Sequence, residues 1–263
     1  MRVLALTRYQ RLGSSSRVRF YQYFPYLKAQ GIDIVNVPFF GDDYVYNLYT
    51  GRGSSIKAIT QAYLKRIFTL AHGASFDLLW VEKELLPWFP AWLESLFQAF
   101  HIPFIVDYDD AVFHRYDMHP TPLVRRLLGH KIDSVMRHAA LVIVGNKYLA
   151  DKAVKAGARR VEILPSVVDV SRYRLKKPIE ASTFNIGWIG SPVTTPYLNI
   201  ISEALSQLNR ESSINLVLIG AGNIQSFHSI STEILPWSEE IELTLSQKFD
   251  VGLMPLLDLQ DNR

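Results

Sequence analysis

Short apolar runs alternate with longer amphipathic stretches along most of this chain, and this alternation constrains its fold more than any other feature. The apolar runs are nearly continuous, as in parallel strands that are covered on both faces. In the first part of the chain we expect strands at Val3–Thr7, Asp33–Val37, Leu78–Val81, Phe104–Asp107, Leu141–Val144 and Val161–Leu164. Helical patterns separate them, at Val18–Ala29, Ser55–Ala71, Leu85–Phe100, Pro122–His138 and Lys147–Ala156. This order predicts an α/β fold with a doubly wound parallel sheet.

The alternation stops between Pro165 and Ser182 and then resumes, which indicates two domains. The interruption is polar and contains Pro178, as an interdomain linker would. We therefore expect one domain at residues 1–170, a linker at 171–183 and a second α/β domain at 184–263. The second domain should have strands at Phe184–Ile189, Asn215–Ile219, Glu233–Pro236 and Asp250–Met254 and helices at Thr195–Asn209 and Glu239–Gln247. Doubly wound domains usually have about six strands, so this domain is expected to be incomplete.

The 263-residue chain contains no cysteine, which excludes disulfides, Cys-ligated zinc, iron–sulfur clusters and thiol catalysis. No apolar run reaches the roughly 20 residues that a membrane-spanning helix needs. The first apolar run is also too short for a secretory signal. We therefore expect a cytoplasmic protein, with the inner face of the cytoplasmic membrane as one location that remains open.

Charge is distributed unevenly along the chain, whose net charge is +3. Residues 1–183 carry 25 Lys and Arg against 16 Asp and Glu, whereas residues 184–263 carry 3 against 9. The basic part would attract anionic lipid, a phosphorylated acceptor or nucleic acid, although ordinary variation among domains explains the imbalance equally well. We expect no nucleic-acid partner, because no basic–aromatic module is present.

An aromatic segment after the third predicted strand has two interpretations. Trp88, Phe89 and Trp92 would suit a membrane interface if they faced outward, and the preceding helix would add charge through Lys57, Lys65 and Arg66. Most such segments are simply part of the core. Peripheral contact with a membrane therefore remains open.

The loop after the first strand has the composition of an anion-binding site. Gly13 permits close approach of a ligand, Ser14 and Ser15 offer hydroxyls at a helix start, and Arg17 adds positive charge. A larger residue at Gly13 is expected to block the ligand and leave the fold intact. The alternative is a plain helix cap. The loop lacks the Gly-x-Gly-x-x-Gly pattern, so we expect no NAD there.

Acidic side chains follow the fourth predicted strand. Asp107, Asp109 and Asp110 lie within four residues, with His114 close behind. Such a cluster favours hydrogen bonding to sugar hydroxyls or general-base catalysis, with a solvated acidic loop as the alternative. No regular ligand spacing is present, so we expect no metal. Asn146, after the next strand, is a good helix N-cap, and capping alone would explain it.

The second domain has its own glycine-rich strand ends. Gly190, Ser191, Thr194 and Thr195 precede a helix that starts with proline, an arrangement suited to a diphosphate. The Gly220–Gly222 pair is weak evidence for NAD, because the third glycine and an acidic ribose partner are missing. Trp237 could flank a nucleobase or belong to the core.

Several segments, in this order along nearly the whole chain, resemble family 4 glycosyltransferases. They are Gly13–Leu27, Glu82–Pro87, Asp107–Phe113, Gly145–Ala150, Leu164–Asp169, Ile186–Pro192 and Asp250–Leu256. The resemblance implies the GT-B fold, in which two Rossmann-like domains bind the acceptor and the nucleotide-sugar donor respectively. It also implies transfer with retention at the anomeric carbon, without a metal or other cofactor.

The resemblance assigns roles to residues of this sequence. Asp109 and Asp110 occupy the catalytic position, with Asp109 in place of the family's histidine. Donor binding falls to Gly13, Ser14, Ser15, Arg17, Gly190, Ser191, Thr194, Thr195 and Gly220, the nucleobase to Trp237, and the acceptor side to Asp107, His114 and Asn146. The arginine and lysine that many members use near the second-domain helix are missing here. Serine, threonine and helix amides, or Arg8 and Arg17, would have to hold the diphosphate instead.

The family's paired-glutamate motif and final helices should follow the last predicted strand, and the sequence ends before them. The resemblance therefore implies a fragment with weakened donor binding. The function implied is transfer of a sugar to a saccharide or lipid-linked acceptor in envelope or exopolysaccharide synthesis. A non-catalytic GT-B protein that binds a saccharide or a partner is the main alternative, and an NAD-dependent oxidoreductase is a weaker one.

Overall fold

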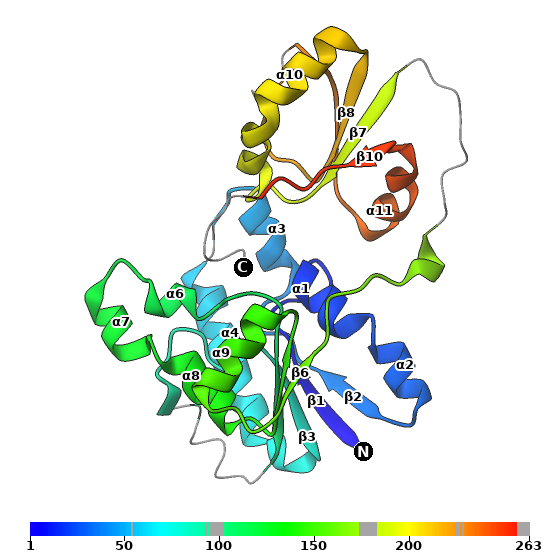
Figure 1. Ribbon diagram of the computed structural model, residues 1–263. Helices are drawn as coiled ribbons and strands as arrows, with labels where there is room; N and C mark the ends of the chain where they lie inside the picture. Colours follow the sequence, from blue (N-terminus) through cyan, green and yellow to red (C-terminus); the bar gives the residue numbers. More distant parts are fainter. Residues whose placement is uncertain are drawn as a thin grey trace. The chain divides into compact units, whose positions relative to one another are not determined.

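The computed structural model describes residues 1–53, 55–92, 94, 102–173, 183–224, 227 and 229–256. The chain divides into two compact units, one containing Met1–Val168 and the other Asp169–Asp258. Each unit contains a parallel sheet accompanied by helices, which confirms the predicted fold class (Figure 1). Residues 174–182 of the predicted linker lie outside the described residues, and the roles of the two units toward acceptor and donor stay predictions.

Unit 1 is built on a six-stranded sheet in the order β2-β1-β3-β4-β5-β6, and all of its strand pairs are parallel. The strands are β1 (Arg2–Leu6), β2 (Asp33–Asn36), β3 (Leu78–Glu82), β4 (Phe104–Tyr108), β5 (Leu141–Val144) and β6 (Val161–Ile163). All six strands were predicted. The strand order reverses between β1 and β3, which is the switch point where doubly wound sheets bind ligands.

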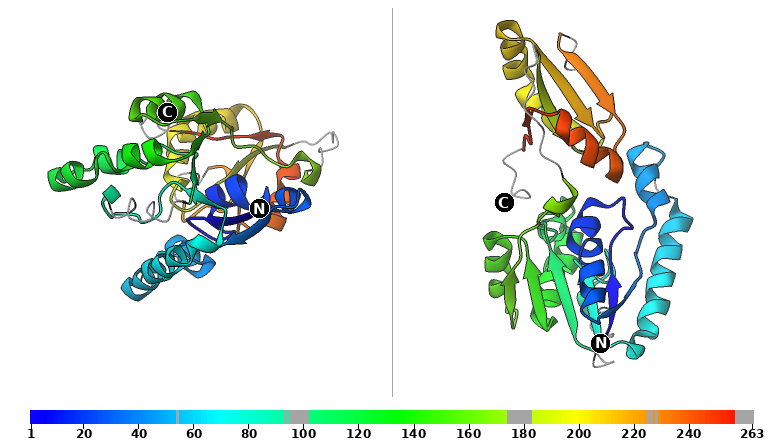
Figure 2. Two further views of the ribbon diagram at one scale, coloured as in Figure 1. Left: turned by 90° about the horizontal axis from the view of Figure 1, so that it is seen from below. Right: turned by 90° about the vertical axis from the view of Figure 1, so that its right-hand side faces the viewer.

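Helices cover both faces of this sheet, as the continuous apolar strands require. They are α1 (Ser14–Ser16), the π-helical turn η1 (Arg17–Tyr21), α2 (Phe24–Ala29), α3 (Asp42–Tyr49), α4 (Ile56–Ala71), η2 (Gly73–Ser75), α6 (His114–Asp117), α7 (Pro122–Leu128), α8 (Lys131–His138) and α9 (Lys147–Ala156). Side chains of β3 alternate between the faces: Trp80 stacks on Phe20 with ring centroids 4.3 Å apart, while Leu79 and Val81 join the core under α4, α8 and α9. Figure 2 shows α4 running along the sheet.

Three helix predictions for unit 1 were wrong in part. The helix expected at Val18–Ala29 is the π-helical turn η1 followed, after a turn, by α2. The helix expected at Pro122–His138 is two helices, because Gly129 ends α7 and α8 starts at Lys131. The helix expected from Leu85 does not start there, since Lys83 and Trp88 adopt positive φ angles of 66° and 63°. Its far end lies outside the described residues. Helices α3 and α6 were not predicted.

Unit 2 contains a parallel four-stranded sheet in the order β10-β7-β8-β9. Its elements are η3 (Val170–Arg172), β7 (Phe184–Ile189), η4 (Thr195–Ile201), α10 (Ser202–Glu211), β8 (Ile214–Ile219), β9 (Ser231–Leu235), α11 (Glu239–Leu245), η5 (Ser246–Lys248) and β10 (Val251–Gly252). Figure 1 shows α10 and α11 on opposite sides of the sheet. The helix expected at Thr195–Asn209 begins as the 3₁₀ helix η4. No described helix is both long and apolar enough to span a bilayer.

Close packing in unit 2 explains why β7 contains a glycine. A Cβ atom at Gly187 would lie 2.0 Å from the Phe249 ring, whereas one at Gly252, its register partner on β10, would meet no atom within 4 Å. A side chain at Gly187 would therefore displace an aromatic ring from the sheet.

We predict that Gly187→Ala destabilises unit 2 by about 1–3 kcal/mol, the usual cost of overpacking. Urea unfolding followed by tryptophan fluorescence would measure the change through Trp188, which lies in the core of unit 2. Gly252→Ala is the matched control and should change stability by less than about 0.5 kcal/mol. Equal effects of the two variants would contradict the packing argument.

Candidate functional site

Charged side chains gather where β1, β3 and β4 end, beside the switch point of the unit 1 sheet. Glu82 closes β3, Asp107 lies in β4, and Asp109 and Asp110 follow β4 directly. Because these strands are adjacent and parallel, their carboxyl ends meet at one edge. This edge is the candidate functional site.

Glu82 fixes the loop that follows β1. One of its carboxylate oxygens accepts hydrogen bonds from the Ser16 hydroxyl at 2.6 Å and from the Arg8 N–H at 2.7 Å. The Ser16 hydroxyl oxygen in turn accepts one from the Tyr9 N–H at 3.0 Å. Burial raises the pKa of Glu82, which is only 3% exposed. Glu82 thus holds the loop in place from inside the unit.

Asp107 and Arg19 form a buried ion pair behind this edge. The Arg19 Nε atom lies 2.8 Å from an Asp107 carboxylate oxygen, and the Arg19 guanidinium also donates to the Leu164 carbonyl. Burial raises the pKa of Asp107 to about 7, against the opposing effect of Arg19. Both side chains are almost fully buried. Asp107, predicted on the acceptor side, therefore lies beneath the surface.

Lys83 bridges the two aspartates predicted to be catalytic. Its Nζ atom lies 2.9 Å from Asp109 and 2.8 Å from Asp110. Burial lowers the pKa of Lys83, but the two carboxylates outweigh it and hold this pKa above its usual range. The side chain of Asp110 is 66% exposed and that of Asp109 only 15%. Asp110 is therefore the carboxylate of this pair that faces solvent.

Asp109 is held in its charged form. Burial opposes its ionisation, but the Lys83 ammonium and a hydrogen bond from Ser15 hold the pKa of Asp109 below its usual range. A carboxylate that binds protons so weakly is a poor general base near neutral pH. Its geometry suits positioning of Lys83 and of the Ser15 loop.

The loop from Tyr9 to Arg17 is compact, and its glycine has a packing reason. A Cβ atom at Gly13 would lie 2.4 Å from Tyr9 Cβ, which cannot move without its backbone. The expectation that a larger residue leaves the fold intact was therefore wrong. Ser14 is exposed beside Gly13, while the Arg17 guanidinium donates to the Arg11 carbonyl at 3.1 Å.

His114 and Asn146 lie on the loops after β4 and β5. The His114 ring is hydrogen-bonded through Nδ1 to an Asp117 carboxylate oxygen at 2.9 Å and through Nε2 to the Tyr148 hydroxyl at 2.7 Å. The Asn146 side chain accepts the Leu149 N–H at 3.0 Å, so its interpretation as the N-cap of α9 is confirmed. No potential metal site of three or more acidic or histidine side chains occurs among the residues that the structure covers.

In unit 2, threonine hydroxyls shape the loop between β7 and η4. The Thr194 hydroxyl accepts the Ser191 N–H at 3.0 Å, and the Thr195 hydroxyl donates to the Ser191 carbonyl at 3.0 Å. The Thr195 oxygen also accepts the Gly222 N–H of the next strand-end loop at 2.9 Å. These hydroxyls are already engaged inside the protein.

The glycines of unit 2 are also explained by loop packing. A Cβ atom at Gly220, where φ is +75°, would lie 2.4 Å from the Gly190 carbonyl oxygen, and one at Gly190 would strike the Trp188 ring. The Gly220–Gly222 pair thus needs no dinucleotide to account for it. The Trp237 indole N–H donates to Glu242 at 2.9 Å, which occupies the polar edge of that ring.

Several residues that order this region were not predicted from the sequence. In a second buried network, Lys131 lies 2.6 Å from Glu84 and 2.9 Å from Glu94, and the Tyr116 hydroxyl donates to Glu84 at 2.8 Å. Burial raises the pKa of Glu94. The run Glu82–Glu84 directly after an apolar strand was the available signal, since buried carboxylates need partners.

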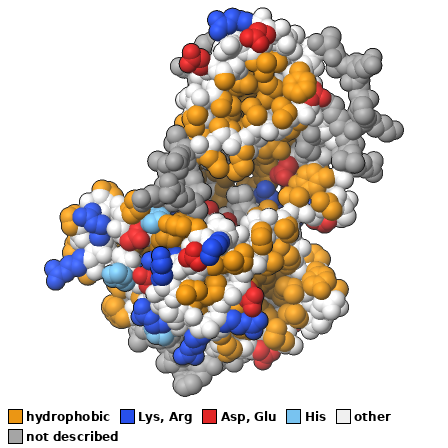
Figure 3. Space-filling model, viewed as in Figure 1, with side chains coloured by type: hydrophobic (Ala, Val, Ile, Leu, Met, Phe, Trp, Pro, Cys, Tyr) orange, Lys and Arg blue, Asp and Glu red, His pale blue; other side chains and the backbone are white. Residues whose placement is uncertain are grey.

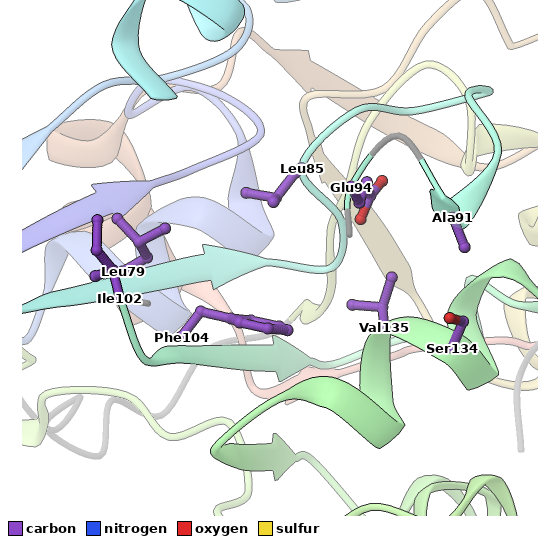
Figure 4. Close-up of a pocket in the computed structure, with 8 residues that line it drawn as sticks. All are labelled: Leu79, Leu85, Ala91, Glu94, Ile102, Phe104, Ser134 and Val135. Atoms are coloured by element: carbon purple, nitrogen blue, oxygen red, sulfur yellow. The ribbon is translucent and has the colours of Figure 1, made fainter. Parts of the chain in front are cut away.

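A small cavity in unit 1 lies beside the segment that follows β3. It is lined by Leu79, Leu85, Ala91, Glu94, Ile102, Phe104, Ser134 and Val135 (Figure 4). Leu79 and Phe104 belong to the amino-terminal halves of β3 and β4, whereas Leu85 and Glu94 follow β3. Its volume of about 20 Å³ accommodates roughly one water molecule and no sugar.

We predict that Lys83→Met lowers stability at pH 7 by about 3–5 kcal/mol, because Asp109 is left buried without its cation. Asp109 has a lowered pKa, so the stability that it contributes is present above its unfolded pKa near ~4 and is lost as pH falls. The variant should therefore lose less stability than the wild type between pH 6 and pH 3, as measured by urea unfolding.

Lys147→Met is the matched control, since Lys147 pairs with Asp151 at 3.0 Å on the exposed surface of α9. Its effect should stay below about 1 kcal/mol. Parallel pH profiles for the wild type and Lys83→Met would contradict the role given to Lys83.

Comparison with known proteins shows the fold. No protein-family model matches the chain, and no curated protein matches it. A glycosyltransferase from Rickettsia africae matches with a TM-score of 0.60 at 12% identity, over 95% of this chain and 72% of that one. A trehalose 6-phosphate synthase from Burkholderia multivorans matches with a TM-score of 0.53 at 12% identity, over 98% of this chain and 78% of that one.

A UDP-GlcNAc 2-epimerase from Neisseria meningitidis, bound to UDP-GlcNAc, matches with a TM-score of 0.50 at 11% identity, over 99% of this chain and 84% of that one. At such low identity these likenesses speak for the fold alone. The two parallel-sheet units of this chain have the GT-B fold.

Proposed function

We propose that this chain transfers a sugar from a nucleoside-diphosphate sugar to a saccharide or lipid-linked acceptor, as a retaining family 4 glycosyltransferase of envelope or exopolysaccharide synthesis. The observation that carries this proposal is the Lys83–Asp109–Asp110 cluster at the switch point of unit 1. The fold supports it, because two of the similar structures are a glycosyltransferase and a trehalose 6-phosphate synthase. The similar epimerase is bound to UDP-GlcNAc, which makes a nucleotide sugar a reasonable donor.

In this proposal Asp110 and Asp109 have different tasks. Asp110 is exposed and accepts hydrogen bonds from hydroxyls of the transferred sugar, as carboxylates commonly do. Asp109 is a positioning residue that holds Lys83 and the Ser15 loop. On the acceptor side, Asp107 anchors the edge from below, while His114 and Asn146 order the loops beside it.

In unit 2, the donor diphosphate would lie against the glycine-rich loops that follow β7 and β8. Ser191 is the hydroxyl proposed to contact phosphate, with Thr194, Thr195, Gly190 and Gly220 giving the loop its shape. In unit 1, Ser14 and Arg17 are the proposed anion-binding groups. Such sites accelerate transfer by orienting the reactants and stabilising the departing diphosphate, and they need no metal or other cofactor for that. Trp237 is proposed on the nucleobase side through its ring face.

An exposed apolar surface on unit 1 supports peripheral contact with an anionic membrane at the cytoplasmic face. Trp88, Phe89 and Trp92 are 46%, 39% and 62% exposed. Phe89 adjoins α4, where the Tyr63 ring packs 5.1 Å from the Phe89 ring and the Tyr63 hydroxyl donates to the Pro87 carbonyl. Helix α4 exposes Leu64 and Phe68 together with Lys57 and Lys65. The expectation that Arg66 would add to this charge was wrong, because Arg66 is buried and donates to the Thr7 carbonyl.

Further basic side chains lie on another part of unit 1. Figure 3 shows Lys and Arg on the side of unit 1 where α7, α8 and α9 lie. Exposed members of this set are Arg125, Arg126, Lys147 and Lys155. A basic surface favours phosphatidylglycerol-containing bilayers, and an amphipathic face adds apolar insertion.

We predict that Asp110→Asn lowers kcat/KM roughly 10- to 100-fold, as expected when a charge-assisted hydrogen bond to the transferred sugar is lost. A panel of UDP-, GDP- and TDP-sugars with saccharide acceptors would first identify the donor. Asp151→Asn, which removes an exposed aspartate from α9, is the control and should leave turnover unchanged.

Nucleotide-sugar binding without any turnover of the wild type would overturn the enzymatic proposal. Saccharide binding in the absence of nucleotide-sugar binding would favour the non-catalytic GT-B protein instead.

We predict that Lys65→Glu weakens binding to vesicles containing phosphatidylglycerol roughly 30-fold, since the substitution changes the charge by two units and each unit near such a surface is worth ~1 kcal/mol. Vesicle co-sedimentation would measure the partition coefficient. Lys28→Glu, an equal charge change on α2, is the control and should weaken binding much less. Equal losses for both variants would indicate general charge attraction without an oriented surface.

A further inference from the structure

A histidine in unit 1 is hydrogen-bonded on both sides of its ring. His114 Nδ1 lies 2.9 Å from an Asp117 carboxylate oxygen, and His114 Nε2 lies 2.7 Å from the Tyr148 hydroxyl. The side chain of His114 is only 12% exposed, whereas Tyr148 as a whole is 37% exposed. The three side chains thus form a chain of hydrogen bonds that runs from Asp117 to a tyrosine hydroxyl at the surface.

This chain of hydrogen bonds lies at the same edge as the candidate site. His114 begins α6 four residues after Asp110, and Tyr148 lies in the first turn of α9, directly after β5. The Gly145 N–H donates to the Tyr108 carbonyl at 2.9 Å, so the loops after β4 and β5 are joined there. Tyr148 therefore belongs to the carboxyl-end edge of the sheet.

The hydrogen-bonding capacities of the three groups fix their direction. A charged carboxylate can only accept a hydrogen bond, so in the His114 tautomer that fits Asp117 the ring carries one proton and holds it on Nδ1. Nε2 is then an acceptor and takes the hydroxyl proton of Tyr148. The oxygen of Tyr148 consequently presents lone pairs outward, and its preferred ligand is a hydrogen-bond donor.

We propose that Tyr148 accepts a hydrogen bond from a hydroxyl of the acceptor saccharide, and that His114 and Asp117 are positioning residues that set this polarity. The inference rests on the proposed transferase function and names one acceptor contact for it. A phosphate or carboxylate offers mainly acceptor atoms near neutral pH and would be disfavoured at this oxygen. Tyr148 therefore selects a neutral hydroxyl in preference to an anion.

The polarity can be tested without any substrate. Nitrogen-15 NMR of the full chain at pH 8 should show His114 in the Nδ1–H form, with Nε2 unprotonated. In Asp117→Asn the amide can donate to Nδ1, which moves the proton to Nε2, as for the aspartate of a catalytic triad. An Nε2–H form in the wild type would overturn the proposed polarity.

The contact with a saccharide is tested by the kinetics of transfer. Tyr148→Phe should raise KM for the acceptor roughly three- to tenfold and change kcat less, as loss of one neutral hydrogen bond predicts. Asp117→Asn should cause a similar loss although it keeps the Tyr148 hydroxyl. Tyr26→Phe, at an exposed tyrosine of α2, is the control and should leave KM unchanged.

The outcomes separate this inference from the function on which it rests. Active wild type with an unchanged KM in Tyr148→Phe overturns the contact and leaves the transferase proposal standing. If the wild type transfers no sugar, a panel of methyl glycosides serves as the probe in saturation-transfer NMR. Binding that weakens in Tyr148→Phe then supports the contact without catalysis, and binding that does not weaken, or does not occur, overturns it.

Discussion

Burying a carboxylate in a protein costs several kcal/mol unless cations or hydrogen-bond donors come with it, and unit 1 depends on meeting this requirement repeatedly. Among the described residues of this unit, the buried carboxylates are Glu82, Glu84, Glu94 and Asp107. Glu82 accepts hydrogen bonds from the Ser16 hydroxyl and a backbone N–H. Glu84 and Glu94 form ion pairs with Lys131, and Asp107 forms one with Arg19. Because each partner comes from a different element, these pairs tie the loops to the sheet.

This requirement also separates residues that support the site from residues that can meet a ligand. Asp107 lies inside with Arg19, and Asp109 is largely covered by Lys83, whereas Asp110 faces solvent. Three aspartates that are nearly consecutive in sequence thus have three different environments. The ligand contacts proposed for this edge rest on Asp110, on the hydroxyl of Tyr148, and on Ser14 and Arg17 in the loop after β1.

The sequence was sufficient for the strands because each strand of a covered parallel sheet is a short apolar run, and all six in unit 1 were predicted. It was less sufficient where tertiary contacts decide the backbone. The segment after β3 has an apolar helical pattern, but Lys83 adopts a positive φ angle next to its two aspartates and the helix does not start there. Glycines were misjudged for a related reason. Gly13 and Gly190 suggest space for a ligand, and in the folded protein that space is taken by Tyr9 and Trp188.

One hydroxyl in unit 2 has a mechanical consequence. Thr195 donates to the Ser191 carbonyl of its own loop and accepts the Gly222 N–H of the loop after β8. The two glycine-rich loops are thereby hydrogen-bonded to each other, and the Gly190 carbonyl packs against Gly220. A displacement of either loop must lengthen the hydrogen bond between Gly222 and Thr195 or move the other loop with it. The two loops should therefore move together as one rigid segment, held by the two hydrogen bonds of the Thr195 hydroxyl.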